Sequence, residues 1–296
     1  MPRRHDDTPK IDPRDFKVKE GERVRLAQLA TSIPAVYASD HDYEAQLARH
    51  VRRLSELQEL LYASDVYALL AVFQGMDTSG KDGAIKHVMS GVNPQGCQVT
   101  SFRRPSGSEL EHDFLWRAAR ELPERGRIGI FNRSYYEEVV VVRVHPDLLD
   151  AQAIPADSRG DKLWRARFKS IKGFEAHLFR GGMQVVKFFL HLSKQEQRKR
   201  LLARLDESDK QWKFRAGDLD ERKCWSDYMK AYSASIEATS TRESPWYVVP
   251  ADDKRTARLI VSQVLIETLG ALDMHYPEMA AEDKRRLHSF RADLER

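Results

Sequence analysis

The sequence contains only two cysteines, Cys97 and Cys224, in 296 residues. Two cysteines cannot build a disulfide framework, and their wide separation matches no metal-binding spacing. Long apolar runs are also lacking, because the longest one, 66–73, has eight residues, far fewer than the ~20 that cross a bilayer. No apolar stretch follows the charged N-terminus, so no secretory signal is expected. These absences favour a soluble, cytoplasmic protein that has no membrane partner.

The overall charge is almost balanced, with 49 Lys+Arg against 45 Asp+Glu and a formal net charge of +4. The hydrophobic fraction of 41% is enough to bury a core and excludes a largely disordered chain. Residues 159–215, however, hold 16 Lys/Arg and 6 Asp/Glu, a local charge of +10. A solvated charged helix is the simplest explanation of such a run. A bound polyanion is the alternative, and we expect no nucleic acid because no recognition pattern accompanies the charge.

Apolar runs of strand length alternate with segments of helical periodicity. The predicted strands are 66–74, 98–102, 127–131, 183–190 and 246–250. The predicted helices are 43–61, 84–89, 108–120, 163–179, 195–205, 224–238, 256–269 and a tail from 277. This alternation predicts an α/β fold with a central parallel five-stranded sheet. We expect an N-terminal arm over 1–40 and a single domain over 41–296. Within the arm, residues 1–27 are expected to be mobile or to lie along the surface.

A glycine-rich turn follows the first predicted strand and opens a predicted helix. Its sequence, GMDTSGKDG (75–83), fits the phosphate-loop template of Gly, four residues, Gly-Lys. In this context backbone N–H groups and the helix N-terminus converge on an anion, and Lys81 can reach the terminal phosphates. The position after Lys81, normally Ser or Thr, holds Asp82, and Asp77 lies within the loop. Carboxylates beside phosphates suggest metal ligation or proton transfer, although Asp82 could also complement the charge of the helix N-terminus.

The third predicted strand ends in FNRSYYEE (131–138). Asn132 stands where phosphate-loop enzymes often have a metal-assisting acid, and Glu137 or Glu138 could supply the missing charge. Arg133 comes at the carboxyl end of a strand, where α/β sheets bind ligands, and its planar guanidinium suits phosphate oxygens. A structural salt bridge is the other role open to Arg133.

Five motifs together resemble the family-2 polyphosphate kinases. They are GMDTSGKDG (75–83), SGVNPQG (90–96), HDFLWR (112–117), FNRSYYEE with VVVVRVHP (131–146) and DKQWKF (209–214). The resemblance runs from about residue 66 to 249. It implies a P-loop NTPase-like, thymidylate-kinase-like three-layer sandwich with a helical lid at about 193–223. It also implies Mg²⁺-dependent, reversible phosphoryl transfer between inorganic polyphosphate and nucleotides, with Mn²⁺ as a substitute ion. The GKDG and FNRSYYEE motifs look like the subgroup that accepts both AMP and ADP.

The motifs and the resemblance give a set of candidate site residues. The catalytic candidates are Asp77, Lys81, Asp82 and Arg133. The phosphate or polyphosphate contacts are Gly75, Ser79, Gly80, Lys81, Gly83, Arg133, Arg200, Arg204 and Lys213. The nucleotide contacts are Asn93, Arg117, Asn132 and Glu137, and the metal ligands are Asp77, Asp82 and Glu137. Family analogy adds a dimer or tetramer and a guanine nucleotide as a second acceptor class.

Two other functions are weighed against this one. The first is an ATP-dependent nucleoside monophosphate kinase on the same fold. The second is a nucleotide-regulated protein that binds RNA or another polyanion through residues 159–215. The second ranks last, because paired carboxylates in the loop oppose polyanion binding unless a metal ion is present.

Overall fold

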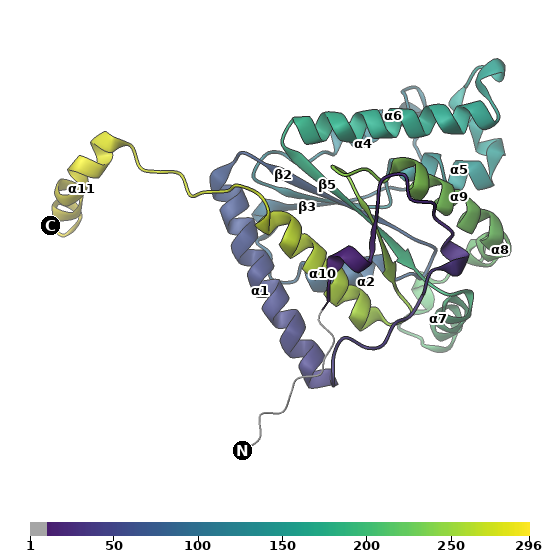
Figure 1. Ribbon diagram of the computed structural model, residues 1–296, viewed down its shortest axis with the longest axis horizontal. Helices are drawn as coiled ribbons and strands as arrows, with labels where there is room; N and C mark the ends of the chain where they lie inside the picture. Colours follow the sequence, from purple (N-terminus) through teal and green to yellow (C-terminus); the bar gives the residue numbers. More distant parts are fainter. Residues whose placement is uncertain (1–10) are drawn as a thin grey trace.

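The computed structural model describes residues 11–296 of the chain (Figure 1). The strands are β1 (Lys17–Val18), β2 (Ala68–Gln74), β3 (Cys97–Ser101), β4 (Ile128–Asn132), β5 (Met183–His191) and β6 (Trp246–Pro250). The first helices are α1 (Asp40–Ser64), α2 (Lys81–Val88), α3 (Gly107–Leu110), α4 (Trp116–Arg120) and α5 (Val141–Val144). The later ones are α6 (Asp161–Arg180), α7 (Lys194–Asp206), α8 (Gly217–Lys223), α9 (Trp225–Thr239), α10 (Lys254–Gly270) and α11 (Ala281–Leu294).

The strands form one six-stranded sheet in the order β1-β6-β5-β2-β4-β3. The five predicted strands are confirmed, and they run parallel to one another. The sixth strand, β1, was not predicted, and it pairs antiparallel with β6. It has only two residues in a polar segment, so it carries no apolar periodicity that could be read from sequence. The sheet therefore has a mixed edge where a purely parallel one was expected.

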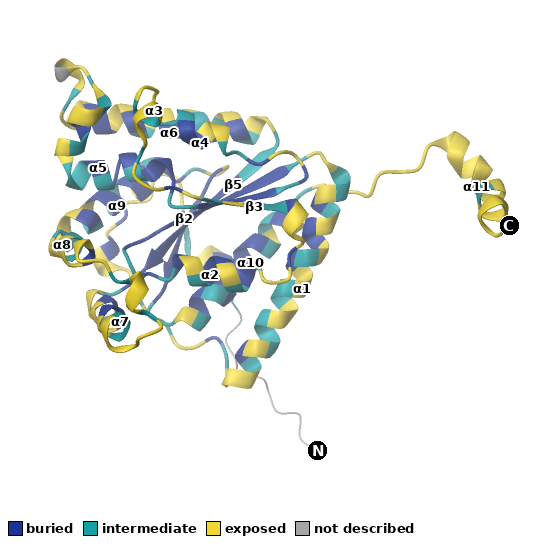
Figure 2. Cartoon of the chain, turned by 180° about the vertical axis from the view of Figure 1, so that it is seen from behind, coloured by how far each residue is buried: buried dark blue, intermediate teal, exposed yellow. Residues whose placement is uncertain are grey.

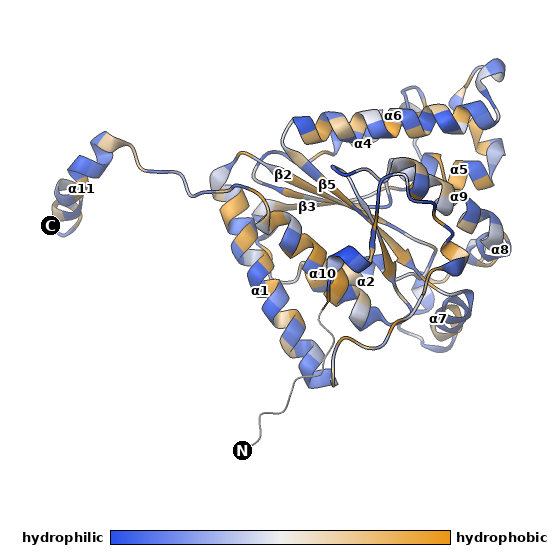
Figure 3. Ribbon diagram, viewed as in Figure 1, coloured by the Kyte–Doolittle hydropathy of each residue, from blue (hydrophilic) through white to orange (hydrophobic). Residues whose placement is uncertain are grey.

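Helices cover both faces of the sheet, as expected for a three-layer sandwich. One face of β2 packs against α1, α2 and α10 through residues such as Leu69 and Phe73. The other face packs against α4, α6 and α9 through Leu70 and Val72. Every residue of β2 is therefore buried, which Figure 2 shows as dark blue strands and Figure 3 as apolar ones. This burial explains the continuous apolar run.

The helix predicted over 108–120 is wrong as a single element, because α3 and α4 are separate and short. The Asp113 carboxylate accepts a hydrogen bond from the backbone N–H of Leu115 at 2.9 Å, and this turn interrupts the helix. Local bonds of this kind compete with the helical ladder. The break makes α4, which begins at Trp116, a separate helix next to β3.

The two ends of the described chain differ in how they pack. Residues before α1 contribute Val24, Leu26 and Val36 to the buried core. At the other end, α11 stands apart from the body in Figure 1, and none of its residues is buried. No helix in the segment 11–296 combines the length and apolarity needed to cross a membrane.

The strand order fixes where a ligand site can form. From β2 the chain crosses to β3 and β4 on one side and to β5 and β6 on the other. β2 and β4 are parallel neighbours, so the turns after them emerge side by side at the carboxyl edge of the sheet. A crevice at such a switch point is where open α/β sheets bind ligands.

Candidate active site

The phosphate loop lies between β2 and α2, as the sequence predicted. Gly75 has φ +150°, and a Cβ on it would lie 2.7 Å from Ser79 Oγ and 2.9 Å from the Leu190 carbonyl. Gly80 has φ +101° and precedes the first residue of α2. Both positions therefore need glycine. Gly80 and Gly83 lie at the start of α2, where free backbone N–H groups favour an anion, whereas the backbone N–H of Ser79 bonds to the Met76 carbonyl at 3.0 Å.

Lys81 is buried inside the curve of the loop, with 8% of its surface exposed. Its Nζ donates to the carbonyl oxygens of Gly75 at 2.8 Å and Met76 at 3.2 Å. Burial, aided by the nearby Arg133 cation, lowers the pKa of Lys81 to about 8 from its ordinary 10.5, while Asp77 and the other acids oppose this shift. The ammonium is thus held where it can meet a phosphate that enters the loop.

Arg133 joins the two turns at the carboxyl edge of the sheet. Its guanidinium donates to Asp77 Oδ1 at 2.8 Å and to Glu137 Oε2 at 3.2 Å. Its backbone N–H bonds to the Phe73 carbonyl at 3.0 Å, and its φ is +62°, a left-handed conformation that costs a non-glycine residue energy. Glu137 and Asp77 together raise the pKa of the guanidinium. The fold thus holds a strained, permanently charged donor next to the phosphate loop.

The metal ligands named from the sequence do not form a cluster of three. Within residues 11–296 no three His, Cys, Asp or Glu side chains come close enough together to hold an ion. The physical reason is that Arg133 pairs with both Asp77 and Glu137, while Asp82 Oδ1 accepts from Asn132 Nδ2 at 2.6 Å. The three acids are therefore separated by their hydrogen-bond partners.

The oxygen donors present still suit Mg²⁺. This ion is usually held by one or two carboxylates together with water and substrate phosphates, not by an all-protein cage. Asp77 and Asp82 provide two such carboxylates at the loop. The buried hydroxyl oxygen of Thr78, between them in sequence, finds no hydrogen-bond partner among the described residues. The loop thus offers hard oxygen ligands for one ion.

Arg200, predicted as a phosphate or polyphosphate contact, is engaged within the protein. It is buried, with 7% of its surface exposed. All five of its N–H donors are engaged: Nε with Glu196, Nη1 with the carbonyls of Thr78 and Ser79, and Nη2 with the carbonyls of Ala251 and Asp252. A guanidinium has no sixth donor, so Arg200 is left with none for phosphate. Its place is beneath the loop, which it ties to α7 and to the turn before α10.

The other predicted lid contacts differ from each other. Arg204 pairs with Asp218 at 3.1 Å and donates to the Lys213 carbonyl, which links α7 to α8 within the lid. Lys213 itself is exposed, with its ammonium 5.0 Å from the centre of the Trp212 ring. Of these residues, the structure leaves Lys213 most accessible to a ligand.

The basic stretch 159–215 is not one surface. Arg167, Lys187 and Arg200 are buried within the fold. Lys187 is fully buried in an ion pair with Glu175, whose carboxylate also accepts from the hydroxyls of Tyr135 and Tyr136. Burial lowers the pKa of Lys187, and Glu175 opposes the shift. The local charge of +10 therefore overstates the cation density available to a polyanion.

Asn93 is not brought to the active-site edge. It caps the short 3₁₀ turn before β3, where its side chain accepts from the backbone N–H of Gln95. β3 runs parallel to β4, so Asn93 lies at the amino edge of the sheet, one strand length from Asn132. The position is opposite the phosphate loop, and the structure gives no support for a nucleotide contact there.

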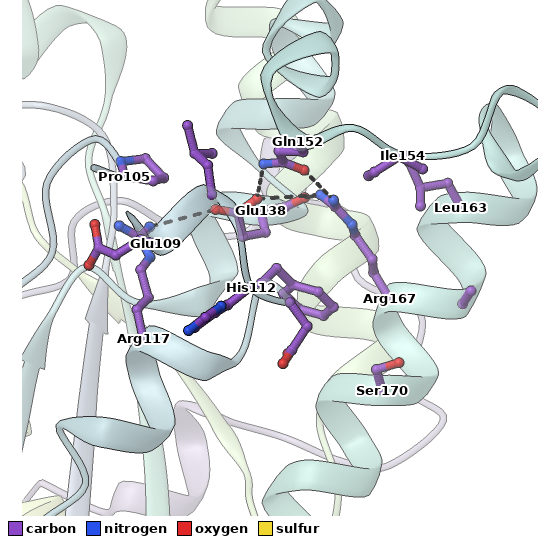
Figure 4. Close-up of a pocket in the computed structure, with 14 residues that line it drawn as sticks. Pro105, Glu109, His112, Arg117, Glu138, Gln152, Ile154, Leu163, Arg167 and Ser170 are labelled. Carbon is purple, nitrogen blue, oxygen red and sulfur yellow. Dashed lines mark hydrogen bonds and ion pairs between the residues drawn. The ribbon is translucent and has the colours of Figure 1, made fainter. Parts of the chain in front are cut away.

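Arg117 lines a cavity of about 290 Å³ between α4 and α6. Its Nη1 donates to the Arg103 carbonyl at 2.8 Å, and its Nη2 lies 3.6 Å from Glu138. Figure 4 shows Glu138 between Arg117 and Arg167, with Gln152 bonded to both Glu138 and Arg167. Glu138 is thus turned away from the loop, and burial raises its pKa against the opposing effect of the two arginines.

Sequence reasoning missed Arg167 and Gln152 of this cluster, as well as Gln197, which donates to the Asp77 carbonyl at 3.1 Å. A signal for Arg167 did exist. It lies on the apolar stripe of α6, between Leu163 and Ile171. A charged residue is unusual on a buried helix face. No such signal marks Gln152, because the 3₁₀ turn that carries it has no periodicity.

The sequence of this chain is similar to those of known phosphotransferases. The family model described as "Polyphosphate kinase 2 (PPK2)" matches residues 37–277. An ADP-polyphosphate phosphotransferase of Rhodopseudomonas palustris is 56% identical over 286 residues, which cover 96% of this chain and 99% of the relative. An AMP/ADP-polyphosphate phosphotransferase of Meiothermus ruber is 47% identical over 227 residues, covering 77% of this chain and 81% of that protein.

Solved structures give the same result. The crystal structure of polyphosphate kinase 2 from Arthrobacter aurescens TC1 superposes with a TM-score of 0.84 at 39% identity. The match covers 94% of this chain and 97% of that one. The fold of this chain is thus also that of an experimentally determined relative. The chain belongs to the polyphosphate kinase 2 family.

Proposed function

We propose that this protein transfers phosphoryl groups between inorganic polyphosphate and adenine nucleotides, and that it accepts both AMP and ADP. The relatives named for ADP and for AMP/ADP support this choice of acceptors. The observation that carries the proposal is the convergence of Lys81 and Arg133 on the phosphate loop beside Asp77. Two cations and a set of loop N–H groups at one sheet edge suit a group whose charge is spread over several oxygens.

Lys81 and Arg133 would position the terminal phosphate of polyphosphate. In the free protein both donors are satisfied internally, Lys81 by loop carbonyls and Arg133 by Asp77 and Glu137. An incoming phosphate would replace the neutral carbonyl contacts of Lys81 with charge-assisted ones and would compete with the two carboxylates for Arg133. The acceptor is an ionised phosphate oxygen of the nucleotide, so no strong general base is required. Orientation and electrostatic stabilisation then account for most of the rate.

Asp77 and Asp82 are the residues we assign to Mg²⁺, and Mn²⁺ would suit the same oxygen donors. When bound, the ion would supply charge neutralisation to the transferring phosphates. Asn132 holds the Asp82 carboxylate in place through the 2.6 Å hydrogen bond. Glu137 holds Arg133 at 3.2 Å, so its role is to position that guanidinium. The exposed Lys213 of the lid remains our candidate for contacting the polyphosphate chain.

The experiment is a nucleotide assay with inorganic polyphosphate as the only phosphoryl donor. Purified protein with Mg²⁺ should convert AMP to ADP and ADP to ATP. Chromatography of the nucleotides follows the reaction in both the forward and the reverse direction. Lys81→Ala should abolish turnover, and the matched control Lys86→Ala, an exposed lysine on the same helix, should not. Product from AMP only when ATP replaces polyphosphate would instead identify an ATP-dependent nucleoside monophosphate kinase. Chelation of Mg²⁺ should stop the reaction, and undiminished turnover would contradict the metal assignment.

The same assay with GMP and GDP tests the guanine nucleotides. The dimer or tetramer and the cytoplasmic location stay predictions, which light scattering of the purified protein and cell fractionation would test. Salt-sensitive RNA binding without nucleotide conversion would favour the polyanion-binding alternative.

A further inference from the structure

The turn that carries Arg133 also has a side that faces the core of the fold. Arg133 and Glu137, at its two ends, form an ion pair beside the phosphate loop. Between them, Tyr135 and Tyr136 are completely buried in the apolar cluster that packs α6 and α9 on the sheet. The tyrosine rings and the ion pair therefore share one short stretch of backbone. Contacts that fix the rings in the core also fix the stretch that presents Arg133.

The backbone of Arg133 depends on such support. Its φ of +62° is a left-handed conformation, which a non-glycine residue keeps only where the surrounding structure holds it. The start of the turn is held by the backbone N–H of Arg133, which donates to the Phe73 carbonyl at 3.0 Å. The rest of the turn is held by the side chains of Tyr135 and Tyr136, which reach across to α6.

Both tyrosine hydroxyls meet at one carboxylate oxygen. Tyr135 donates to Glu175 Oε1 at 2.9 Å, and the hydroxyl of Tyr136 lies 2.8 Å from the same oxygen. Burial and the charge of Glu175 raise the pKa of both tyrosines, so that both hydroxyls stay protonated and remain donors. Since a carboxylate oxygen has two lone pairs, Glu175 Oε1 can hold both rings at once.

Lys187 neutralises this carboxylate from the neighbouring strand, β5. Its ammonium pairs with Glu175 Oε2 and also donates to the Thr239 carbonyl at 2.8 Å. Glu175 and Lys187 are both almost completely buried. Such an ion pair adds little to stability, because well-packed apolar residues in its place are often equally stable or more so. Its presence points to a use of the carboxylate other than stability, namely as the acceptor that holds the turn.

We propose that Glu175 is a positioning residue for phosphoryl transfer. It holds Tyr135 and Tyr136, and through them it holds the Arg133 guanidinium in the orientation that meets the transferring phosphate. Lys187 supports this role by neutralising the buried carboxylate. The inference rests on the proposed function, because it takes Arg133 as a contact of that phosphate.

The test compares two double variants that both lack the ion pair. Glu175→Leu combined with Lys187→Met removes the acceptor of the two hydroxyls. Glu175→Gln combined with Lys187→Met keeps an amide oxygen that can accept from both of them. Neither variant leaves a buried charge without its partner, and Tm is measured for each so that turnover is assayed well below unfolding.

The variant with leucine should lose about 10- to 100-fold in kcat, because misplacing a positioning group by about 1 Å can cost 100-fold. Its KM for the nucleotide should stay within about twofold of the native value, since the lost contact acts in the transition state. The variant with glutamine should regain most of the kcat. An ion pair with a merely structural role predicts the same kcat for both.

A third variant removes the hydroxyls themselves. Tyr135→Phe combined with Tyr136→Phe keeps both rings in the core and should show the same loss of kcat. The matched control is Tyr43→Phe, which removes the hydroxyl of a buried tyrosine on α1 that accepts from Arg258 at 3.1 Å. This control should keep the native kcat.

Two results would overturn the inference. Either the leucine and glutamine variants have the same kcat, or Tyr135→Phe combined with Tyr136→Phe has the native kcat. If the leucine variant does not fold, the tyrosine variant decides alone. Absence of any polyphosphate-dependent product from the native protein would refute the proposed function, whereas native turnover that is insensitive to these changes would refute only the role of Glu175.

Discussion

Replacing Arg200 by lysine should destabilise the free protein, even though the charge is kept. Arg200 makes five hydrogen bonds in three directions, to Glu196, to the loop carbonyls of Thr78 and Ser79, and to the carbonyls of Ala251 and Asp252. A lysine ammonium is a single point donor, so it can keep one carbonyl pair and loses about three of the five bonds. At about 0.5–1.5 kcal/mol each, the lost bonds lower the unfolding free energy by about 2–4 kcal/mol.

For a chain of this size, with an unfolding entropy of roughly 0.6 kcal/mol/K, such a loss corresponds to a fall in Tm of roughly 3–7 °C. Scanning calorimetry without polyphosphate or nucleotide measures it directly. Arg198→Lys is the matched control, because Arg198 is exposed on the same helix and should change the Tm little. The turnover of Arg200→Lys should also drop, since the loop carbonyls lose their anchor. An unchanged Tm with a raised, salt-sensitive KM for polyphosphate would refute the reasoning and place Arg200 in the polyphosphate path.

Three other perturbations follow from the same site. Because the pKa of Lys81 is lowered to about 8, its ammonium is lost as pH rises through that value, so the KM for polyphosphate should increase above pH 8; in Lys81→Arg this limb of the pH profile should be absent. Lys187→Met leaves the Glu175 carboxylate buried without its partner and should cost about 3–5 kcal/mol in urea unfolding, whereas Lys187→Met combined with Glu175→Leu should recover much of it. Gly75→Ala would force a Cβ to 2.7 Å from Ser79 Oγ, so we expect loss of turnover, and wild-type rates would contradict the tight loop path.

The phosphate loop was predictable because its signal is local. Strand, glycine turn and helix follow one another in sequence, and the backbone requires glycine at positions 75 and 80. The same holds for the five parallel strands, whose burial on both faces is written as continuous apolar runs. In these segments local preference and tertiary environment agree.

The sequence is less informative where a side chain's role depends on distant partners. Arg200 was assigned to polyphosphate because it shares a helix face with Arg204, yet its acceptors come from the segments around residues 78 and 251. The sequence predicts Asp77, Asp82 and Glu137 as metal ligands, but it does not show that the guanidinium of Arg133 pairs with two of them, Asp77 and Glu137. Neither arrangement leaves a periodic trace in the sequence. A basic stretch likewise does not say which of its cations face solvent, as the buried Lys187 shows.

The two-residue strand β1 has a practical consequence for shortened versions of the chain. Residues 17 and 18 cover the outer side of β6, whose backbone would otherwise present free N–H and C=O groups to solvent. The domain predicted from the sequence starts at residue 41. A fragment that starts there would lack this cover and also the buried Leu26 and Val36. An exposed parallel-sheet edge is a template for self-association. Expression of the fragment should therefore yield aggregates, while a version starting at residue 11 should remain monodisperse in gel filtration.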